Sequence, residues 1–244
     1  MMEKSNEFLD LVYDNQLSPF KKRKHRLKYR SLFRDVSFHN KSVLDIGGGY
    51  GMSSFFMAYL GAIKCINVEP EGLGSRSGLY KKFNLIKDLL GIDNVEFRAE
   101  TFQDFKSNGE VYDIVLLDQS INHLDEEACI DLQTNPNSRK TYLEIFTKLY
   151  KLSNKNSQLI ISDCSRYNFF QLLNIKNPIA PSIEWEKHQS PKVWIKLLKE
   201  VGFSNPSVTW RSNPKFGKFG EVFFKSRFVY YFFNSHFDLI MKKL

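Results

Sequence analysis

The sequence predicts an α/β domain in which a mostly parallel sheet is covered by helices on both faces. Two observations predict this class. From residue 42 onward, short runs rich in β-branched residues alternate with longer stretches whose apolar residues recur at spacings of three and four. A glycine-rich turn, GGGYG at 47–51, directly follows the first of these runs. Such alternation is typical of βαβ units, which build parallel sheets.

The first 40 residues are expected to form an N-terminal helical extension. The net charge of +8 is concentrated here, because residues 20–34 hold eight basic residues and no acid, whereas the rest of the chain carries 27 charges of each sign. An apolar stripe at helical spacing runs through the same segment. Its members are Tyr29, Leu32, Phe33 and Val36. We expect the stripe to dock and the lysines and arginines to stay outside.

Seven runs are expected to be strands. They fall at 42–45, 63–68, 95–98, 113–117, 158–162, 207–210 and 237–241. Helical spacing predicts one helix over 79–90 and another from Ser190-Pro191 to Gly202, where serine suits a cap, proline the first helical position and glycine the end.

Two segments are longer than the strand-helix pattern needs. Residues 163–190 form a long aromatic connection after the fifth strand, and long connections in compact domains tend to be functional. Residues 211–233 insert many aromatic and basic residues before the last strand. We expect the insertion to cap the sheet edge or the active site, with a membrane-surface contact or a homodimer contact as the alternative.

Composition narrows the class further. The chain has 244 residues, 42% of them hydrophobic and 25% charged, which supports one sizeable core and excludes disordered and collagen-like proteins. Its longest uncharged run, 46–63, contains five glycines and two serines, so no membrane-spanning helix is predicted. The three cysteines lie far apart, and the first residues show no secretory signal. We therefore expect a single domain in the reducing cytoplasm.

The glycine turn is the strongest functional signal. Glycines are required where backbone passes close to a ligand, and the helix that follows offers free N–H groups to an anion. A dinucleotide fingerprint would need glycine at position 52, which is Met52. The observed D-x-G-x-G-x-G resembles the first motif of the class I S-adenosylmethionine-dependent methyltransferases. This resemblance assigns the acid and the glycines to the cofactor site: Asp45, Gly47, Gly48, Gly49 and Gly51.

The ends of the next three strands extend the resemblance. Glu69-Pro70 follows the second strand, about 20 residues after the turn, where the family's acid accepts both ribose hydroxyls. Glu100-Thr101 follows the third and resembles the adenine-contacting segment. Asp118 follows the fourth and opens D-Q-S-I-N-H, which resembles the segment over the methionine part of the cofactor. Each acid taken alone is typical of a helix cap or a solvated charge. The four matches together favour a cofactor site.

The resemblance covers roughly residues 40–210 and implies a Rossmann-like, seven-stranded sheet whose last strand is reversed. It also implies S-adenosylmethionine as cofactor and S-adenosylhomocysteine as product. On this basis residues 1–244 are expected to form one methyltransferase domain. Within it, 1–40 would be a lid, 41–162 the cofactor-binding core, and 163–244 the substrate side.

Methylation of a hydroxyl requires removal of its proton, and a positioned base accelerates such a step by about 10² to 10⁴. Two histidines are candidates: His123 follows the fourth strand, and His188 lies in the long connection after the fifth. Packing over the cofactor and a surface position are the respective structural alternatives. Asp118 and Asp163 stand where the catechol-type enzymes hold Mg²⁺, but Cys164 replaces their asparagine. We therefore expect no metal, with a metal-dependent O-methyltransferase as the lesser alternative.

The acceptor is left open by the sequence. We favour O-methylation of a small molecule, or of a glycan- or lipid-linked acceptor, attracted as an anion by residues 20–34. An RNA acceptor gripped by the same residues is the alternative. The exocyclic-amine motif of base methylases is absent, because the chain reads DQSI from Asp118, and no proline precedes a cysteine. The triple glycine also resembles aminopropyltransferases, but their paired aspartates after the fourth strand are not evident.

Overall fold

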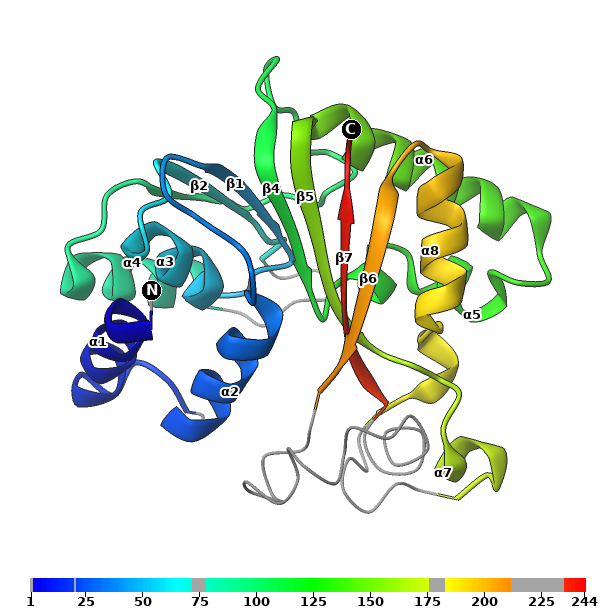
Figure 1. The fold of residues 1–244 in the computed structure, drawn as a ribbon, viewed down its shortest axis with the longest axis horizontal. Helices are drawn as coiled ribbons and strands as arrows, with labels where there is room; N and C mark the ends of the chain where they lie inside the picture. Colours follow the sequence, from blue (N-terminus) through cyan, green and yellow to red (C-terminus); the bar gives the residue numbers. More distant parts are fainter. Residues whose placement is uncertain (1, 20, 72–77, 176–182, 212–234) are drawn as a thin grey trace.

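The structure is a computed structural model that describes residues 2–19, 21–71, 78–175, 183–211 and 235–244. Its centre is a seven-stranded sheet of order β3-β2-β1-β4-β5-β7-β6 (Figure 1). The strands are β1 Ser42–Ile46, β2 Lys64–Val68, β3 Val95–Arg98, β4 Tyr112–Asp118, β5 Ser153–Cys164, β6 Ser204–Trp210 and β7 His236–Lys242. Pairings among β1 to β5 are parallel, and β7 is antiparallel to β5 and β6. The predicted sheet with a reversed last strand is thus confirmed.

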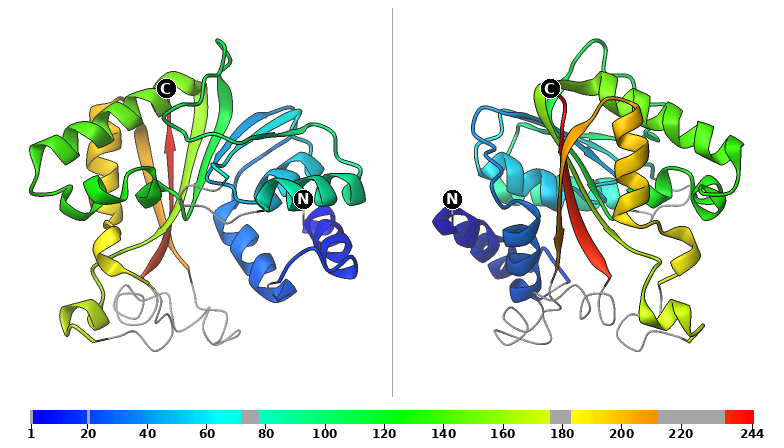
Figure 2. Two further views of the ribbon diagram at one scale, coloured as in Figure 1. Left: turned by 180° about the vertical axis from the view of Figure 1, so that it is seen from behind. Right: turned by 45° about the vertical axis from the view of Figure 1, so that its right-hand side comes forward.

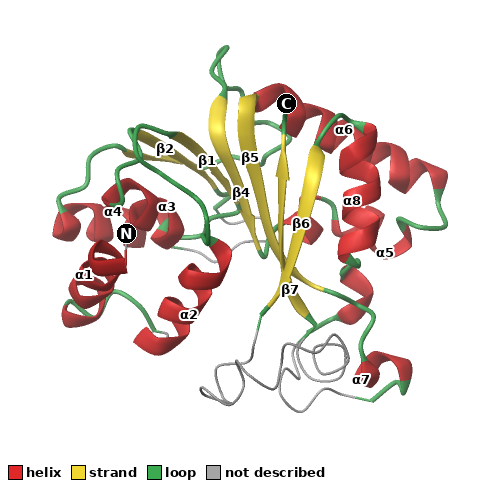
Figure 3. Cartoon of the chain, viewed as in Figure 1, coloured by secondary structure: helices red, strands yellow, loops and turns green. Residues whose placement is uncertain are grey.

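Helices cover both faces of this sheet (Figures 2 and 3). The α-helices are α1 Met2–Asp14, α2 Lys22–Leu32, α3 Met52–Tyr59, α4 Leu79–Leu90, α5 Glu126–Asp131, α6 Pro136–Leu152, α7 Phe169–Leu172 and α8 Pro191–Glu200. Two 3₁₀ turns, η1 Ile121–Leu124 and η2 Trp185–Lys187, lie in the connections. Apolar residues of α1 to α4 form one core with one face of the strands, and those of α5, α6 and α8 form a second core with the other.

The N-terminal stripe docks as the sequence predicts. Tyr29, Leu32, Phe33 and Val36 are all buried in the core beneath α1 to α4. The Tyr29 ring stacks on Phe56 of α3, with ring centroids 4.1 Å apart. This packing fixes α2 beside the carboxyl ends of the parallel strands, at the edge of the sheet where parallel α/β folds bind ligands.

The helix expected from 190 to 202 is α8. Pro191 occupies its first turn, and the chain leaves it at Gly202, whose φ of +113° is a conformation that glycine adopts readily. A Cβ at this glycine would lie 2.9 Å from the Tyr150 ring, so close packing adds to the requirement. Strand β5 begins at Ser153, five residues before the predicted start, because its polar first residues are drawn into the sheet by pairing between Ser153 and Tyr112.

The aromatic insertion at 211–233 lies outside the described residues, apart from Arg211, so its expected capping, membrane or dimer role stays a prediction. The division of the chain into lid, core and substrate side also stays a prediction. No helix in the part of the chain that the structure describes is both long and apolar enough to cross a membrane.

Candidate functional site

The glycine turn after β1 has the backbone that its sequence predicts. Gly47, Gly49 and Gly51 have φ values of +70°, +57° and +79°, in the left-handed region that glycine tolerates best. The Gly47 N–H donates a 2.8 Å hydrogen bond to the Val68 carbonyl of β2, which ties the turn to the neighbouring strand. The turn therefore presents backbone without side chains at these glycines, directly before α3.

Gly48 is required for a different reason, the close approach of two buried polar side chains. A Cβ at this position would lie 2.6 Å from Asp45 Oδ2 and closer still to Asn67 Oδ1. Asp45 Oδ2 accepts a 2.7 Å hydrogen bond from Ser54 Oγ, and Asn67 Nδ2 donates a 2.9 Å bond to the Gly49 carbonyl. Asp45 and Asn67 thus brace the turn from beneath, and burial raises the pKa of Asp45 to about 7. The role of Asn67 was not predicted, although a polar residue inside an apolar strand is a signal for one.

Glu69 lies against the glycine turn, and its predicted role toward a ribose stays a prediction. Its Oε2 accepts a 2.9 Å hydrogen bond from the Gly49 N–H, which places the acid at the end of β2 next to the turn at the end of β1. Pro70 follows and is half-buried. The Glu100-Thr101 segment is different. The Thr101 hydroxyl donates to Asp104 Oδ2 at 2.6 Å and accepts from the Asp104 N–H, so it stabilises a local turn. Its adenine-contacting role stays a prediction.

A cavity of about 180 Å³ opens between the glycine turn, α2 and the end of β4. Three residues of α2 line it, together with the turn, the start of α3 and two strand-end acids. They are His25, Lys28, Tyr29, Asp45, Gly47, Gly48, Gly49, Tyr50, Met52, Ser53 and Asp118. Five of the ten predicted cofactor residues therefore line one cavity, and Glu69 lies beside it through its bond to Gly49.

Lys28 of α2 extends into this cavity and forms an ion pair with Asp118 Oδ2. Burial alone would raise the pKa of Asp118, but the nearby charges of Lys28 and Arg211 hold it below its ordinary value. The other oxygen, Oδ1, is buried and has no hydrogen-bond partner in the part of the chain that the structure describes. His25, one turn earlier on α2, stays neutral because burial, with the charges of Lys28 and Lys24, lowers its pKa to about 4. Neither Lys28 nor His25 was predicted to reach the site.

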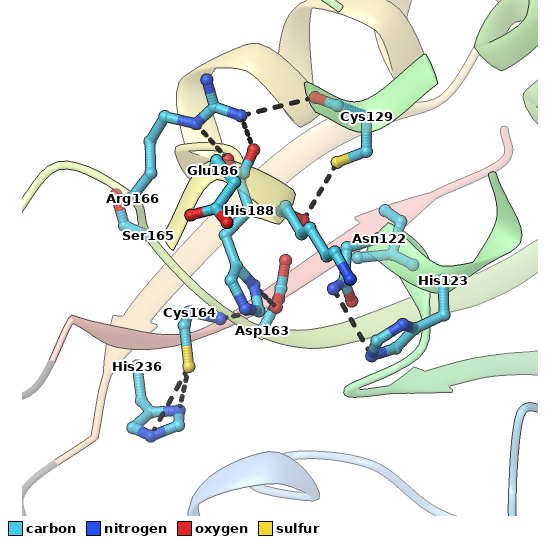
Figure 4. Close-up of polar contacts among 12 residues, drawn as sticks. Asn122, His123, Cys129, Asp163, Cys164, Ser165, Arg166, Glu186, His188 and His236 are labelled. Carbon is cyan, nitrogen blue, oxygen red and sulfur yellow. Dashed lines mark hydrogen bonds and ion pairs between the residues drawn. The ribbon is translucent and has the colours of Figure 1, made fainter. Parts of the chain in front are cut away.

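His188 lies against the carboxyl end of β5 (Figure 4). Its Nδ1 is 2.9 Å from Asp163 Oδ1, and Asp163 is only 1% exposed. Asp163 Oδ1 also accepts a 2.7 Å hydrogen bond from the Cys164 N–H, while Oδ2 has no hydrogen-bond partner among residues 2–19, 21–71, 78–175, 183–211 and 235–244. The His188 side chain is 15% exposed, so the dyad combines a buried acid with an imidazole that reaches solvent.

The backbone that carries His188 is held firmly in place. The Arg166 guanidinium donates hydrogen bonds to the His188 and Glu186 carbonyls and to the Ile130 carbonyl of α5. The Cys129 thiol lies 3.2 Å from the Lys187 carbonyl that it bonds. The connection after β5 is thereby fixed against α5 on both sides of the histidine.

His123 occupies η1, and its Nδ1 is 2.6 Å from Glu126 Oε1. The side chain is 55% exposed, far more than that of His188. Glu126 also pairs with Lys187 at 2.9 Å, one residue before His188. The two predicted histidines therefore flank one ionic cluster, although they belong to separate acid–base pairs.

A further pair lies where β5 ends and β7 begins, with Cys164 Sγ 2.9 Å from His236 Nδ1. Burial, followed by the Arg211 charge, lowers the pKa of His236 to about 4, and burial raises that of the thiol, so both are neutral near pH 7. No group of three or more His, Cys, Asp or Glu side chains suited to a metal ion occurs among the described residues.

The cavity suits the S-adenosylmethionine that the sequence motifs imply. Space is open where a Cβ of Gly49 would project, so the turn leaves room for a ligand against its backbone. Glu69 places a carboxylate beside that space, and the unpartnered Asp118 Oδ1 offers a buried acceptor at the other end. Together with Lys28, these groups can receive hydroxyls, an ammonium and a carboxylate.

Comparisons with known proteins agree with this geometry. A family model described as a methyltransferase domain matches residues 37–202. A search of curated proteins finds no match. Many solved structures share the fold, and three of them serve as examples. They are an S-adenosylmethionine-dependent methyltransferase from Aquifex aeolicus (13% identity, 91% of this chain and 89% of that chain, TM-score 0.57), another from Mesorhizobium loti (9%, 85% and 93%, 0.57), and the plantazolicin methyltransferase BpumL with bound S-adenosylhomocysteine (14%, 96% and 88%, 0.56).

Proposed function

Because the chain belongs to the S-adenosylmethionine-dependent methyltransferases, we propose that it methylates a hydroxyl group and that His188 is the general base. The observation that carries this proposal is the buried Asp163 within 2.9 Å of His188 Nδ1. An ionised carboxylate only accepts hydrogen bonds, so Nδ1 donates its proton to Asp163 and Nε2 keeps a free lone pair. A hydroxyl acceptor needs such a base.

When bound, S-adenosylmethionine supplies a methyl group on a sulfonium that is already activated for displacement. The protein must then align the acceptor, exclude water and receive one proton. His188 Nε2 takes the proton of the hydroxyl, and the resulting imidazolium is stabilised by Asp163. Tyr29, on the buried face of α2, lines the cavity in which the cofactor would lie.

His123 remains the second candidate base. It also has a carboxylate partner, Glu126, but both side chains are exposed and Glu126 is shared with Lys187. A water-exposed ion pair gives a base little orientation, because its interaction energy is typically below about 1 kcal/mol. His188, held by a buried acid and a fixed backbone, fits the role better.

The acceptor that fits best is an anionic small molecule, sugar or lipid-linked compound. The inner face of α2 lines the cavity, and exposed cations lie on its outer face and just before it: Arg23, Lys24 and Arg26 in the helix and Lys21 at its N-cap. Lys22 is paired with Asp10, and Lys28 with Asp118, so two of the predicted exterior cations have internal partners. The exposed cations of this segment can attract a carboxylate or phosphate.

The test is methyl transfer from labelled S-adenosylmethionine to a panel of hydroxylated sugars, phenols and lipid precursors, with and without carboxylate or phosphate, and to RNA. We expect transfer to a hydroxyl of an anionic small acceptor. His188→Gln should lower kcat about 10²- to 10⁴-fold while the Kd for S-adenosylhomocysteine is unchanged. His123→Gln, the matched control, should lower kcat less than tenfold. Methylation of RNA alone, or full activity of His188→Gln, would contradict the proposal.

A further inference from the structure

The Lys28–Asp118 ion pair lies on the wall of the cavity and not on the protein surface. Asp118 ends β4 and has a side chain only 8% exposed, whereas Lys28 enters from α2 and is 24% exposed. Both residues line the space that the glycine turn leaves open. Two opposite charges are therefore presented side by side to whatever occupies the cavity.

Helix α2 does not need this pair for its attachment. Tyr29 and Leu32 are buried in the core on the same helix. A second polar contact, 2.7 Å from Ser31 Oγ to Asp238 Oδ2, ties the next turn to β7. Buried ion pairs in general contribute little net stability, because desolvation of the two charges offsets their attraction. The position of Lys28 thus calls for an explanation other than stability.

Lys28 does not satisfy both oxygens of the Asp118 carboxylate. Oδ2 pairs with Lys28, whereas Oδ1 is buried and has no hydrogen-bond partner among the described residues. An unpartnered buried carboxylate oxygen is costly, and a ligand that donates to it removes that cost. A primary ammonium is a suitable donor, since it carries three N–H groups and a positive charge.

We propose that Lys28 and Asp118 together form the receptor for the amino-acid end of the cofactor, with Asp118 receiving its ammonium and Lys28 its carboxylate. Binding leaves the charge balanced, because the Lys28–Asp118 pair is neutral overall and the amino-acid end of the cofactor is a neutral zwitterion. The ion pair between Lys28 and Asp118 is replaced by two ion pairs, each between one of these residues and the ligand. The inference rests on membership of the S-adenosylmethionine-dependent family and is independent of the acceptor and of His188.

This receptor requires the α-carboxylate specifically. Without that group a ligand leaves Lys28 to compete with the ligand's ammonium for Asp118, so the site selects against decarboxylated cofactor. The arrangement separates the chain from enzymes that use decarboxylated S-adenosylmethionine, a class that the triple glycine alone leaves open.

The experiment uses three ligands that differ only at this end. S-adenosylhomocysteine has both charges, its decarboxylated form S-adenosyl-3-thiopropylamine has only the ammonium, and 5′-methylthioadenosine has neither. Calorimetry on the full chain should rank the wild-type affinities in that order. Lys28→Met should weaken S-adenosylhomocysteine roughly 10- to 100-fold, the value of one lost charge-assisted hydrogen bond. The decarboxylated ligand should bind to Lys28→Met with unchanged or higher affinity, because the Lys28 ammonium no longer competes with the ligand's ammonium for Asp118. The affinity for 5′-methylthioadenosine should be unchanged.

Lys24→Met is the matched control, an exposed lysine one turn earlier on the same helix, and should change none of the three affinities. Asp118→Asn should weaken both ammonium-bearing ligands and spare 5′-methylthioadenosine. The proposal is overturned if Lys28→Met binds S-adenosylhomocysteine within threefold of wild type, or if it weakens all three ligands equally. Wild-type protein that binds none of the three would instead refute cofactor binding itself, which is a different failure.

Discussion

Replacing Gly48 by alanine is expected to destabilise the protein, whereas the same change at Gly49 is expected to weaken cofactor binding at a small cost in stability. The two glycines are neighbours, but the structure gives them opposite constraints. The Gly48 Cβ would meet Asp45 and Asn67, and its φ is not in the left-handed region. The Gly49 Cβ would meet nothing within 4 Å, but its φ is +57°.

The magnitudes follow from these contacts. At Gly48 the new methyl must displace Asn67, which is fully buried and would lose its hydrogen bond to the Gly49 carbonyl. A lost buried hydrogen bond costs about 2 kcal/mol and overpacking about 2 more. The sum of about 4 kcal/mol lowers Tm by roughly 8–16 °C in a chain of this size. At Gly49 only left-handed strain of about 1–2 kcal/mol applies, or roughly 2–8 °C.

Differential scanning calorimetry measures the first effect and titration with S-adenosylhomocysteine the second. Gly49→Ala should stay folded and lose at least about tenfold in affinity, because its methyl fills space in the cavity. Gly48→Ala should lose less stability when Asn67 is already alanine, with a coupling of at least about 1 kcal/mol. A Tm for Gly48→Ala within 3 °C of wild type, or strict additivity with Asn67→Ala, would refute the reasoning.

Two further predictions concern the charges around α2. Asp238 pairs with Arg211 at 2.9 Å, so Asp238→Ala leaves Arg211 as a buried charge without its main partner. Thermal unfolding should show a loss of about 3–5 kcal/mol in the free energy of unfolding, against about 1 kcal/mol for Ser31→Ala, which removes only the hydroxyl bonded to Asp238. Equal losses for the two variants would contradict this ranking. Replacing all four residues 21–24 by glutamine should raise the KM for an anionic acceptor and leave the Kd of S-adenosylhomocysteine unchanged. If neither constant changes in steady-state and binding assays, the segment is only a solvated face.

Much of the fold was predictable because its signals are local. Each strand is a short β-branched run bounded by turn residues, and the stripe that ends at Val36 docks as its spacing indicates. The glycine turn was also predictable, since its sequence requires left-handed backbone at three positions. The early start of β5 was not, because its first residues are polar and join the sheet only through their partner Tyr112.

The site was predictable only in part, because two of its features depend on contacts far apart in the sequence. Asp163 and His188 are 25 residues apart, and the path of the connection that joins them has no local signature. Lys28 was expected among the outward cations. The sequence nevertheless indicates that the Lys28 side chain faces the protein interior. Lys28 lies three residues after His25 and four before Leu32, so helical spacing places it on the same buried face of α2.

The position of β7 has a consequence for how the protein is made. This strand follows all the others in sequence but lies between β5 and β6, and among the described strands β6 pairs with β7 alone. During synthesis the edge of β5 that pairs with β7 therefore stays unpaired until residues 236–242 have emerged from the ribosome. For the same reason β6 cannot join the sheet before that point. Open edges of this kind recruit strands from other chains. Nascent or C-terminally clipped protein should thus depend on chaperones far more than the finished chain does.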